Sequence, residues 1–447
     1  MTPEQALSRL PVPGAGGRYL VAFSGGVDST VLLHAVAVVA GDVPVAAVHV
    51  HHGLQAVADD WDAHCRRVCA ALGVPLTVER VRVDDTGEAA ARTARYAALR
   101  ARTGPGDLLL TAHHADDQAE TFLLQALRGA GVAGLAAMPA MQPFGAGRHL
   151  RPFLGLRRPD LEAYARGRGL DWVEDPSNRD PDVTRSALRA RVMPALETVR
   201  PGAVAGIGRA AAAAADAAAL GREVADADLA ACAGPLAASL SLSRVAALSA
   251  PRRRNLLRRW PRHHGLPSPP PNQLAAIETE LLPARPDAGP RVAWTDAEIR
   301  RYRDWLFLMP CLAPVPGSFE AAWPARSGLA LPAGCGWLAD APADRGGLAG
   351  ERGPYTVRLR RGGERLRLPG RAHDTDLKTW LQAAGVPPWV RARLPLIMAG
   401  ERIAGVADWL VCEGFAAAPG AAGYRPRWIA PPPGAALARV VGGGQFG

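Results

Sequence analysis

The segment SGGVDST, residues 24–30, combines residue types that bind a phosphate group. It joins a short β-prone run at 19–23 to an apolar segment at 31–40, long enough for a helix that begins near Ser29 and Thr30. Such a glycine-rich turn directs backbone N–H groups and the positive end of the helix dipole at an anion. No lysine follows the glycines, which excludes the loop ending in Gly-Lys-Ser/Thr. A structural turn with Asp28 as a helix cap is the alternative.

A second polar segment, HHADDQAET at 113–121, follows a predicted strand at 107–112. Its carboxylates, like that of Asp28, would repel a bound phosphate unless a cation lies between them. The sequence therefore predicts Mg²⁺, a cationic substrate, or both at this place. Zinc is less favoured, because the adjacent His113 and His114 point apart. The alternative is a solvated helix start with acidic residues near its N-terminus.

A third set of candidates lies in a predicted helix at 88–102. Glu88 and Arg92 are four residues apart, as are Arg92 and Tyr96, so they share one helix face. An arginine on that face suits a phosphate or a leaving pyrophosphate. An ordinary salt-bridged helix face is equally compatible with the spacing.

The elements around these motifs alternate between strand and helix. Buried strands are predicted at 45–50, 76–83 and 107–112, and the helices at 59–72, 88–102 and 122–128 come between or after them. This alternation predicts an α/β domain with a doubly wound parallel sheet. Ligands of such sheets bind at the carboxyl ends of the strands. The glycine turn and the acidic segment both follow strand ends, so we expect them to face one pocket.

The alternation stops near 194–201. An alanine-rich helix is predicted at 203–233 and a strand-rich stretch at 291–309. A Pro/Ala/Gly-rich linker is predicted at 314–353, although Trp323 and Trp337 indicate that part of it packs. A third unit begins at Tyr355, with a strand at 357–361, a helix at 376–384 and two strands within 394–409. The tail from 431 is expected to be disordered. The predicted domains are therefore a catalytic domain at 1–200, a mainly helical middle domain at 201–320 and a small α+β domain at 350–430.

The composition indicates a polyanionic partner and an intracellular setting. The chain of 447 residues has a formal net charge of +10, although Lys378 is its only lysine and arginine abundance can reflect genome-wide bias. The arginines at 252–254 and 358–367 are candidates for phosphate-backbone contacts, or they are solvated faces. Six cysteines, no signal peptide and no clear membrane span predict a cytoplasmic protein.

SGGVDST resembles the signature of the PP-loop, or N-type, ATP pyrophosphatases, which implies an adenine nucleotide alpha-hydrolase-like fold. Further segments are similar to the tRNA(Ile)-lysidine synthetase family. They are VHVHHGL at 48–54, EAAARTARYAAL at 88–99, TAHHADDQAETFLLQALRGAGVAGLAAMP at 111–139, WVEDPSNRD at 172–180, and RRGGERLRLPG within the block 357–396. Ser186 departs from this pattern, because the family usually has Asn after the arginine at 185.

The resemblance implies a two-step reaction on the wobble cytidine of an isoleucine tRNA with a CAU anticodon. ATP adenylates O2 of the base, and the ε-amine of free L-lysine then displaces AMP at C2. ATP and Mg²⁺ are the implied cofactors, and the middle and C-terminal units would orient the tRNA. A homodimer is a further expectation. The implied nucleotide-binding residues are Ser24, Gly25, Gly26, Val27, Asp28 and Ser29.

The implied catalytic residues are Asp28, Arg92, His114, Asp117 and Glu120, with Asp28 and Asp117 as metal ligands. Asp117 and Glu120 are the candidates for the lysine amine, and a carboxylate or His114 for its proton. Two alternatives remain open. One is a PP-loop tRNA thiolation enzyme, although such enzymes commonly use paired cysteines and Cys65 and Cys69 are the only close pair here. The other is a non-catalytic basic RNA-binding module with a vestigial glycine turn.

Overall fold

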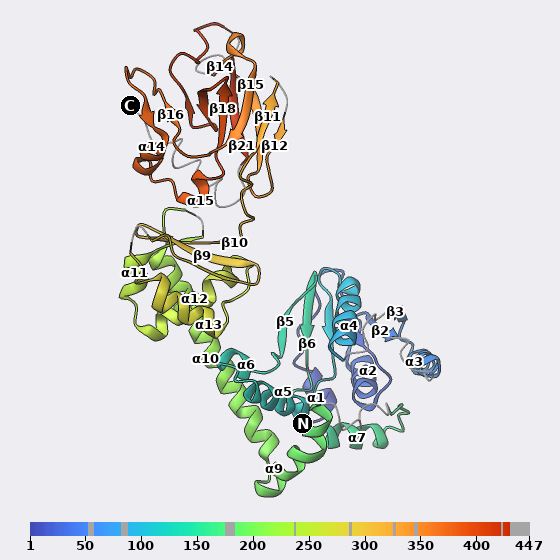
Figure 1. Ribbon diagram of the computed structural model, residues 1–447. Helices are drawn as coiled ribbons and strands as arrows, with labels where there is room; N and C mark the ends of the chain where they lie inside the picture. Colours follow the sequence, from blue (N-terminus) through green and yellow to red (C-terminus); the bar gives the residue numbers. More distant parts are fainter. Residues whose placement is uncertain are drawn as a thin grey trace. The chain divides into compact units, whose positions relative to one another are not determined.

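The structure is a computed structural model, in which the chain divides into two compact units, Met1–Leu220 and Gly221–Gly447 (Figure 1). The described residues are 1–51, 58–81, 88–174, 184–236, 238–285, 288–324, 328–343, 347–421 and 423–429.

The first unit contains a six-stranded sheet in the order β3-β2-β1-β4-β6-β5. Neighbouring strands are parallel except at the edge, where β5 is antiparallel to β6. The strands are β1 (Tyr19–Ala22), β2 (Val45–His51), β3 (Leu76–Arg80), β4 (Leu108–Leu110), β5 (Met141–Phe144) and β6 (Gly147–Leu150). This arrangement confirms the predicted doubly wound parallel sheet.

Besides this sheet, the first unit contains a set of helices. They are α1 (Pro3–Leu7), α2 (Val27–Val39), α3 (Ala58–Ala71), α4 (Glu88–Arg102), α5 (Ala115–Leu127), α6 (Val132–Leu135), α7 (Arg158–Gly167), α8 (Thr184–Ala187), the π-helical turn η2 (Leu188–Val192) and α9 (Met193–Val199). Because side chains alternate along a strand, Val21 packs in one core with α2 and α7, and Leu20 packs in another with Leu99 of α4. The chain order reverses between β2 and β4, the two neighbours of β1, which makes the carboxyl ends of β1 and β4 the expected ligand-binding edge.

One helix boundary differs from the prediction. The sequence pattern predicts that the helix after the glycine turn begins near Ser29, but α2 begins at Val27, with the extended residue Gly26 as its N-cap. The hydroxyls of Ser29 and Thr30 each donate to the carbonyl oxygen of Gly26, at 3.0 Å. These side-chain bonds stabilise an earlier first turn, so Asp28 lies inside the helix and is not its cap.

The predicted alanine-rich helix is α10 (Ala203–Cys232), and the division between the two units falls within it. Among the described residues it is the one helix long and apolar enough to cross a membrane, although only 11% of its most apolar stretch is buried. A single helix of this kind is weak evidence for a membrane span. Asp226 and Asp228 in its last turns form ion pairs with Arg259 and Arg252.

The second unit begins with helices packed on an antiparallel sheet in the order β7-β10-β9-β8. Its elements are β7 (Ser239–Ser241), α11 (Leu242–Ala247), α12 (Ala250–His263), α13 (Pro271–Ala276), the π-helical turn η3 (Ile277–Leu281), β8 (Arg291–Trp294), β9 (Ala297–Tyr302) and β10 (Trp305–Pro310). Trp260, Ile299 and Leu306 are almost fully buried in the core between helices and sheet. The strand-rich stretch predicted at 291–309 is confirmed.

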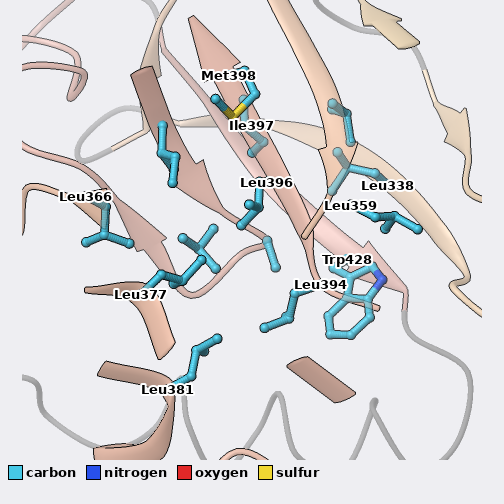
Figure 2. Packing of buried hydrophobic residues seen from close by; sticks show 14 of the residues in the cluster. Leu338, Leu359, Leu366, Leu377, Leu381, Leu394, Leu396, Ile397, Met398 and Trp428 are labelled. Carbon is cyan, nitrogen blue, oxygen red and sulfur yellow. The ribbon is translucent and has the colours of Figure 1, made fainter. Parts of the chain in front are cut away.

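The rest of the second unit is the predicted α+β part. One sheet has the order β11-β15-β18-β19-β20 and another the order β12-β13-β21-β14. The elements are β11 (Glu320–Trp323), β12 (Leu329–Ala330), β13 (Trp337–Ala343), β14 (Leu348–Ala349), η4 (Gly350–Arg352), β15 (Tyr355–Leu359), β16 (Arg365–Leu366), β17 (Thr375–Asp376), α14 (Leu377–Ala383), α15 (Pro388–Arg391), β18 (Pro395–Ala399), β19 (Arg402–Val406), β20 (Leu410–Val411) and β21 (Gly423–Ile429). Figure 2 shows part of their shared core, including Leu394, Leu396 and Trp428.

The linker predicted at 314–353 is wrong, because the described part of this stretch contains four strands. β11 pairs with β15, and β13 and β14 both pair with β21, more than 70 residues further along the chain. Trp323 and Cys335 are buried in the same core. Short strands with distant partners leave little local pattern among prolines and glycines. The domain boundaries at 200 and 320 stay predictions, and the tail from 431 lies outside the described residues.

Candidate active site

The glycine turn connects β1 to α2 and is held by its own side chains. The Ser24 N–H donates to the Ser29 hydroxyl oxygen at 3.2 Å, and the two serine hydroxyls lie 3.1 Å apart. Gly26 is the N-cap residue of α2, and no side chain accepts a capping hydrogen bond from this end of the helix. The first N–H groups of α2 therefore remain the natural donors for an anionic ligand at this helix end.

Gly25 is required by both backbone geometry and space. Its φ of +85° lies in the left-handed region that glycine adopts without steric cost. A Cβ atom at this position would lie 3.1 Å from Sγ of Cys65 and 3.2 Å from Cγ2 of Val173. The carbonyl oxygen of Gly25 accepts a hydrogen bond from the N–H of Val173 at 3.0 Å, so the chain before residue 175 lies against the turn.

The acidic segment forms the first turns of α5, at the carboxyl end of β4. His114 is the N-cap, and it forms a reciprocal capping pair with Asp117. The His114 N–H donates to Oδ2 of Asp117 at 3.1 Å, and the Asp117 N–H donates to Nδ1 of His114 at 3.4 Å. The solvated helix start is therefore excluded for His114, which is 2% exposed.

The structure brings the two motifs together, as the strand order predicts. Nε2 of His114 lies 3.8 Å from Oδ2 of Asp28 and 3.4 Å from Oδ2 of Asp117. Because Nδ1 of His114 accepts from the helix backbone, its ring hydrogen belongs on Nε2, which faces these two carboxylates. His114 therefore directs an N–H group toward the two carboxylates, at ion-pair distance from both.

Asp28 has the geometry of a cation ligand. Its Oδ1 is buried and has no hydrogen-bond partner among the described residues. Burial raises the pKa of Asp28, because a desolvated carboxylate is less stable without a counter-charge. Within the described ranges, no three His, Cys, Asp or Glu side chains form a complete metal site. The residues present therefore fit Mg²⁺ that takes its other ligands from phosphate and water.

Two arginines that the sequence reasoning did not assign bind the acidic segment. Arg185 of α8 donates through Nε to Glu120 at 2.7 Å and through a terminal nitrogen to Asp117 at 3.0 Å. Arg189 of η2 donates through Nε to Glu120, also at 2.7 Å. The arginines are four residues apart, so one helical face presents both guanidinium groups.

This cluster is electrically balanced rather than acidic. Glu120 is 1% exposed and both of its oxygens accept from arginine. Burial alone would raise the pKa of Asp117, but His114 and Arg185 together hold it below its ordinary value. The four charges cancel, so Asp117 and Glu120 do not form an unpaired acidic pocket.

A cavity of about 270 Å³ lies beside this cluster, within the first unit. Its walls carry both signs of charge, from Asp116, Glu120, Glu162, Glu197, Arg157, Arg158 and Arg189. His114 also lines the cavity, and its Nε2 approaches Asp28. Arg157 forms ion pairs with both Asp116 and Glu197. Met193, Pro194 and Val204 supply apolar surface. Such a mixed lining suits a small ligand that carries both charges.

Arg92 is not brought to the glycine turn by any contact in the described residues. Its guanidinium carbon lies 4.9 Å from the ring centroid of Tyr96, on the same helix. Its charge contributes to lowering the pKa of His149 and of Arg151, after burial, so it lies near β6. The side chain of Glu88 and the segments 52–54 and 175–180 lie outside the description.

Cys65 and Cys69 are too buried to act as a reactive thiol pair. Cys65 and Cys69 are buried in the core under α3. Burial raises the pKa of the Cys65 thiol to about 12 and that of Cys69 to about 11, so neither is a thiolate at neutral pH. This geometry does not favour the thiolation alternative.

Comparisons with known proteins agree with this fold. Residues 2–196 match the PP-loop domain family, residues 240–307 the TilS substrate binding domain and residues 355–428 the TilS substrate C-terminal domain. A tRNA(Ile)-lysidine synthase of Methylococcus capsulatus is 45% identical over 416 residues, 90% of this chain and 94% of the relative. One of Pseudomonas aeruginosa is 47% identical over 421 residues, covering 90% and 92%. One of Alkalilimnicola ehrlichii is 45% identical over 433 residues, covering 94% and 96%. The chain therefore belongs to the tRNA(Ile)-lysidine synthase family and carries its ATP-using PP-loop domain.

Proposed function

We propose that this protein ligates free L-lysine to C2 of the wobble cytidine in a CAU-anticodon isoleucine tRNA, consuming ATP and releasing AMP and pyrophosphate. The observation that carries the proposal is the approach of His114 to Asp28, which joins a nucleotide-binding turn to a charged cavity at one sheet edge. Relatives named tRNA(Ile)-lysidine synthase, at about 45% identity over about 90% of the chain, support it. We assign the reaction to the cytoplasm. A homodimer stays a prediction.

In the adenylation step, the turn at Ser24, Gly25, Gly26, Val27 and Ser29 binds the phosphates of ATP through backbone N–H and hydroxyl donors. Asp28 would be the principal ligand of Mg²⁺, since its Oδ1 accepts no hydrogen bond in the described chain. Asp117 can contribute only the lone pairs that Arg185, Arg189 and His114 leave. Mg²⁺, when bound, stabilises the charge of the leaving pyrophosphate. Arg92 is kept as a second candidate for that charge.

In the ligation step, free lysine occupies the cavity beside Glu120. Lysine carries two ammonium groups and one carboxylate, so walls with both carboxylates and arginines suit it better than a purely acidic pocket. The attacking ε-amine must be neutral, and its proton goes to a carboxylate. His114 is not the acceptor, because Nδ1 already accepts a backbone hydrogen bond and Nε2 faces Asp28 and Asp117 as a donor.

The experiment that tests the function combines the protein, ATP, labelled lysine and a CAU-anticodon isoleucine tRNA. We expect label in the RNA only when ATP is present. Without lysine, the reaction is expected to stop at tRNA that carries AMP. The same tRNA with a GAU anticodon is the matched control and stays unlabelled. Absence of label from the CAU tRNA, with ATP consumed or not, would reject the proposal.

The arginines at 252–254 are less available to tRNA than the sequence indicates. Arg252 pairs with Asp228, and Arg253 and Arg254 pair with Glu278. On the same helix, Arg258 and Arg262 are exposed, four residues apart, and without an ion-pair partner in the described chain. We therefore propose these two arginines as the phosphate contacts of α12.

Replacing both Arg258 and Arg262 with alanine is expected to weaken tRNA binding and to make its salt dependence shallower. Loss of two phosphate contacts lowers the magnitude of the slope of log K against log salt by about 2. Binding isotherms at several salt concentrations measure this slope. The control is Arg254→Ala, which removes an arginine that is paired with Glu278. Glu278 then keeps its ion pair with Arg253. Equal slopes for wild type and the double variant would show that Arg258 and Arg262 do not contact phosphates of the tRNA.

A further inference from the structure

A chain of four polar side chains connects β6 to the residue beside the N-cap of α5. A terminal nitrogen of Arg151 lies 3.2 Å from Nδ1 of His149, and Nε2 of His149 lies 2.8 Å from the Thr111 hydroxyl. That hydroxyl lies 2.8 Å from Nδ1 of His113. β4 and β6 are parallel neighbours, with Leu109 opposite His149, which sets this spacing. Thr111, His149 and Arg151 are buried, and His149 is fully enclosed.

The directions of the hydrogens in this chain follow from two facts, the donor-only guanidinium group of Arg151 and the burial of the Thr111 hydroxyl. A guanidinium group can only donate, so Nδ1 of His149 accepts from Arg151 and its ring hydrogen lies on Nε2. Nε2 then donates to the Thr111 oxygen. Thr111 is buried, and the described residues offer its hydroxyl hydrogen no other acceptor than Nδ1 of His113, so the hydroxyl donates there. Nδ1 of His113 accepts, and its own ring hydrogen lies on Nε2.

The histidines in this chain are neutral at physiological pH. Burial, with a smaller contribution from Arg151, lowers the pKa of His149 to about 3. Burial also lowers the pKa of His113, although Asp117 opposes it. A neutral ring with Nδ1 occupied as an acceptor has no free lone pair. Such a ring can donate through Nε2, but it cannot act as a general base.

The Nε2–H of His113 is available to a ligand. His113 is half-buried as a residue, and no hydrogen-bond partner of Nε2 is found in the part of the chain that the structure describes. His113 immediately precedes His114, which lies 3.8 Å from Asp28. A neutral N–H donor at this edge suits an uncharged acceptor atom of a ligand, whereas phosphate oxygens would bind the N–H groups at the N-terminus of α2. On cytosine the acceptors are N3 and O2, and on uracil the N3 position carries a hydrogen and would oppose a donor.

We propose that Arg151, His149 and Thr111 are positioning residues that lock His113 as an Nε2–H donor to the acceptor edge of the target cytosine. His113 thereby contributes to the choice of cytidine over uridine at the wobble position. The tautomer part of the proposal stands on the hydrogen-bond chain alone. The substrate part rests on the proposed function.

The tautomer is tested without any substrate. The protein labelled with ¹⁵N-histidine has 11 histidines, and the His113 signals are those lost in His113→Gln. At pH 7, wild type and Thr111→Ser are expected to show hydrogen on Nε2 of His113. Thr111→Val removes the hydroxyl and is expected to shift the population toward the Nδ1–H tautomer. A wild-type His113 that is Nδ1-protonated or charged overturns the inference, whether or not the protein modifies tRNA.

The substrate contact is tested by adenylation of the CAU tRNA without lysine. Thr111→Val is expected to lower kcat/KM for tRNA at least 10-fold and leave KM for ATP unchanged, with Thr111→Ser close to wild type. In a His113→Gln background, Thr111→Val is expected to have no further effect, because Thr111 acts through His113. The matched control is Thr103→Val, another buried threonine, whose hydroxyl donates to the Leu99 carbonyl. Two results would overturn the contact. One is an equal loss of kcat/KM for tRNA from Thr111→Val with and without His113, and the other is a Thr111→Val variant that keeps the wild-type kcat/KM.

Discussion

Asp28→Asn is expected to lower pyrophosphate release by about 10³-fold and to leave tRNA affinity unchanged. The substitution keeps the size of the side chain and removes the charge that binds a cation. Oδ1 of Asp28 has no other partner in the described residues, so no existing hydrogen bond is sacrificed there. The effect therefore reports on the cation site and not on packing. Pyrophosphate release without lysine, measured at saturating ATP, isolates the adenylation step.

The matched control for Asp28 is Asp42→Asn. Asp42 is an exposed carboxylate between α2 and β2, at the end of α2 opposite to the glycine turn. Its replacement changes the net charge equally and is expected to leave the rate at wild type. Raising the Mg²⁺ concentration is expected to recover part of the Asp28→Asn rate, since a weakened ligand raises the concentration needed. Unchanged turnover in Asp28→Asn would reject the metal assignment.

The sequence predicted the sheet of the first unit because local patterns encode it. The helix predicted at 88–102 coincides with α4, and the buried strand predicted at 45–50 differs from β2 by one residue. Alternating strands and helices predict a parallel sheet whose carboxyl strand ends share one edge, and the structure places β4 beside β1. The approach of the glycine turn to the acidic segment follows from that topology alone.

The parts of the site that escaped prediction depend on distant pairs. Arg185 and Arg189 contact Glu120 from 65 and 69 residues away along the chain. Only the four-residue spacing of the arginines and the three-residue spacing of Asp117 and Glu120 indicated that each pair shares a helix face. The tautomer of His113 depends in the same way on Arg151, which directly follows β6. Local periodicity does not record such contacts, which is why the sequence predicts Mg²⁺ or a cationic substrate at the acidic segment and not its arginine partners.

The same reason explains the wrong linker. β13 has its pairing partner in β21, and no short stretch of sequence shows that partnership. Prolines, glycines and alanines in the region favour an irregular interpretation when they are considered alone. The buried Trp323 was a signal that pointed the other way, since a large aromatic side chain is costly to leave in water.

Glu120→Gln is expected to lower the melting temperature of the first unit by about 8 °C, in line with a loss of about 3 kcal/mol. The buried carboxylate is the shared partner of Arg185 and Arg189, and an amide offers a single acceptor oxygen and no charge. Two guanidinium groups would then face each other with Asp117 as their remaining anion. Calorimetry of the full chain measures the shift of this transition.

Glu298→Gln is the matched control in the second unit. Glu298 is also fully buried, and Nε of Arg291 and Nε of Arg300 bind it at 2.6 and 2.7 Å. The Glu298→Gln substitution is expected to destabilise the second unit by a similar amount and to leave KM for lysine unchanged. Glu120→Gln is expected to raise KM for lysine at least 10-fold, because Glu120 lines the proposed lysine cavity.

The double variant Glu120→Gln/Arg189→Gln separates the structural role of Glu120 from lysine binding. Removing one cation together with the anion restores charge balance, so most of the lost melting temperature is expected to return. The raised KM for lysine is expected to persist, since neither amide replaces a carboxylate facing an ammonium group. Recovery of both the melting temperature and the KM would assign Glu120 to structure alone. The lysine ammonium would then have to bind another of the cavity's carboxylates, of which Asp116 is the nearest to His114 in sequence.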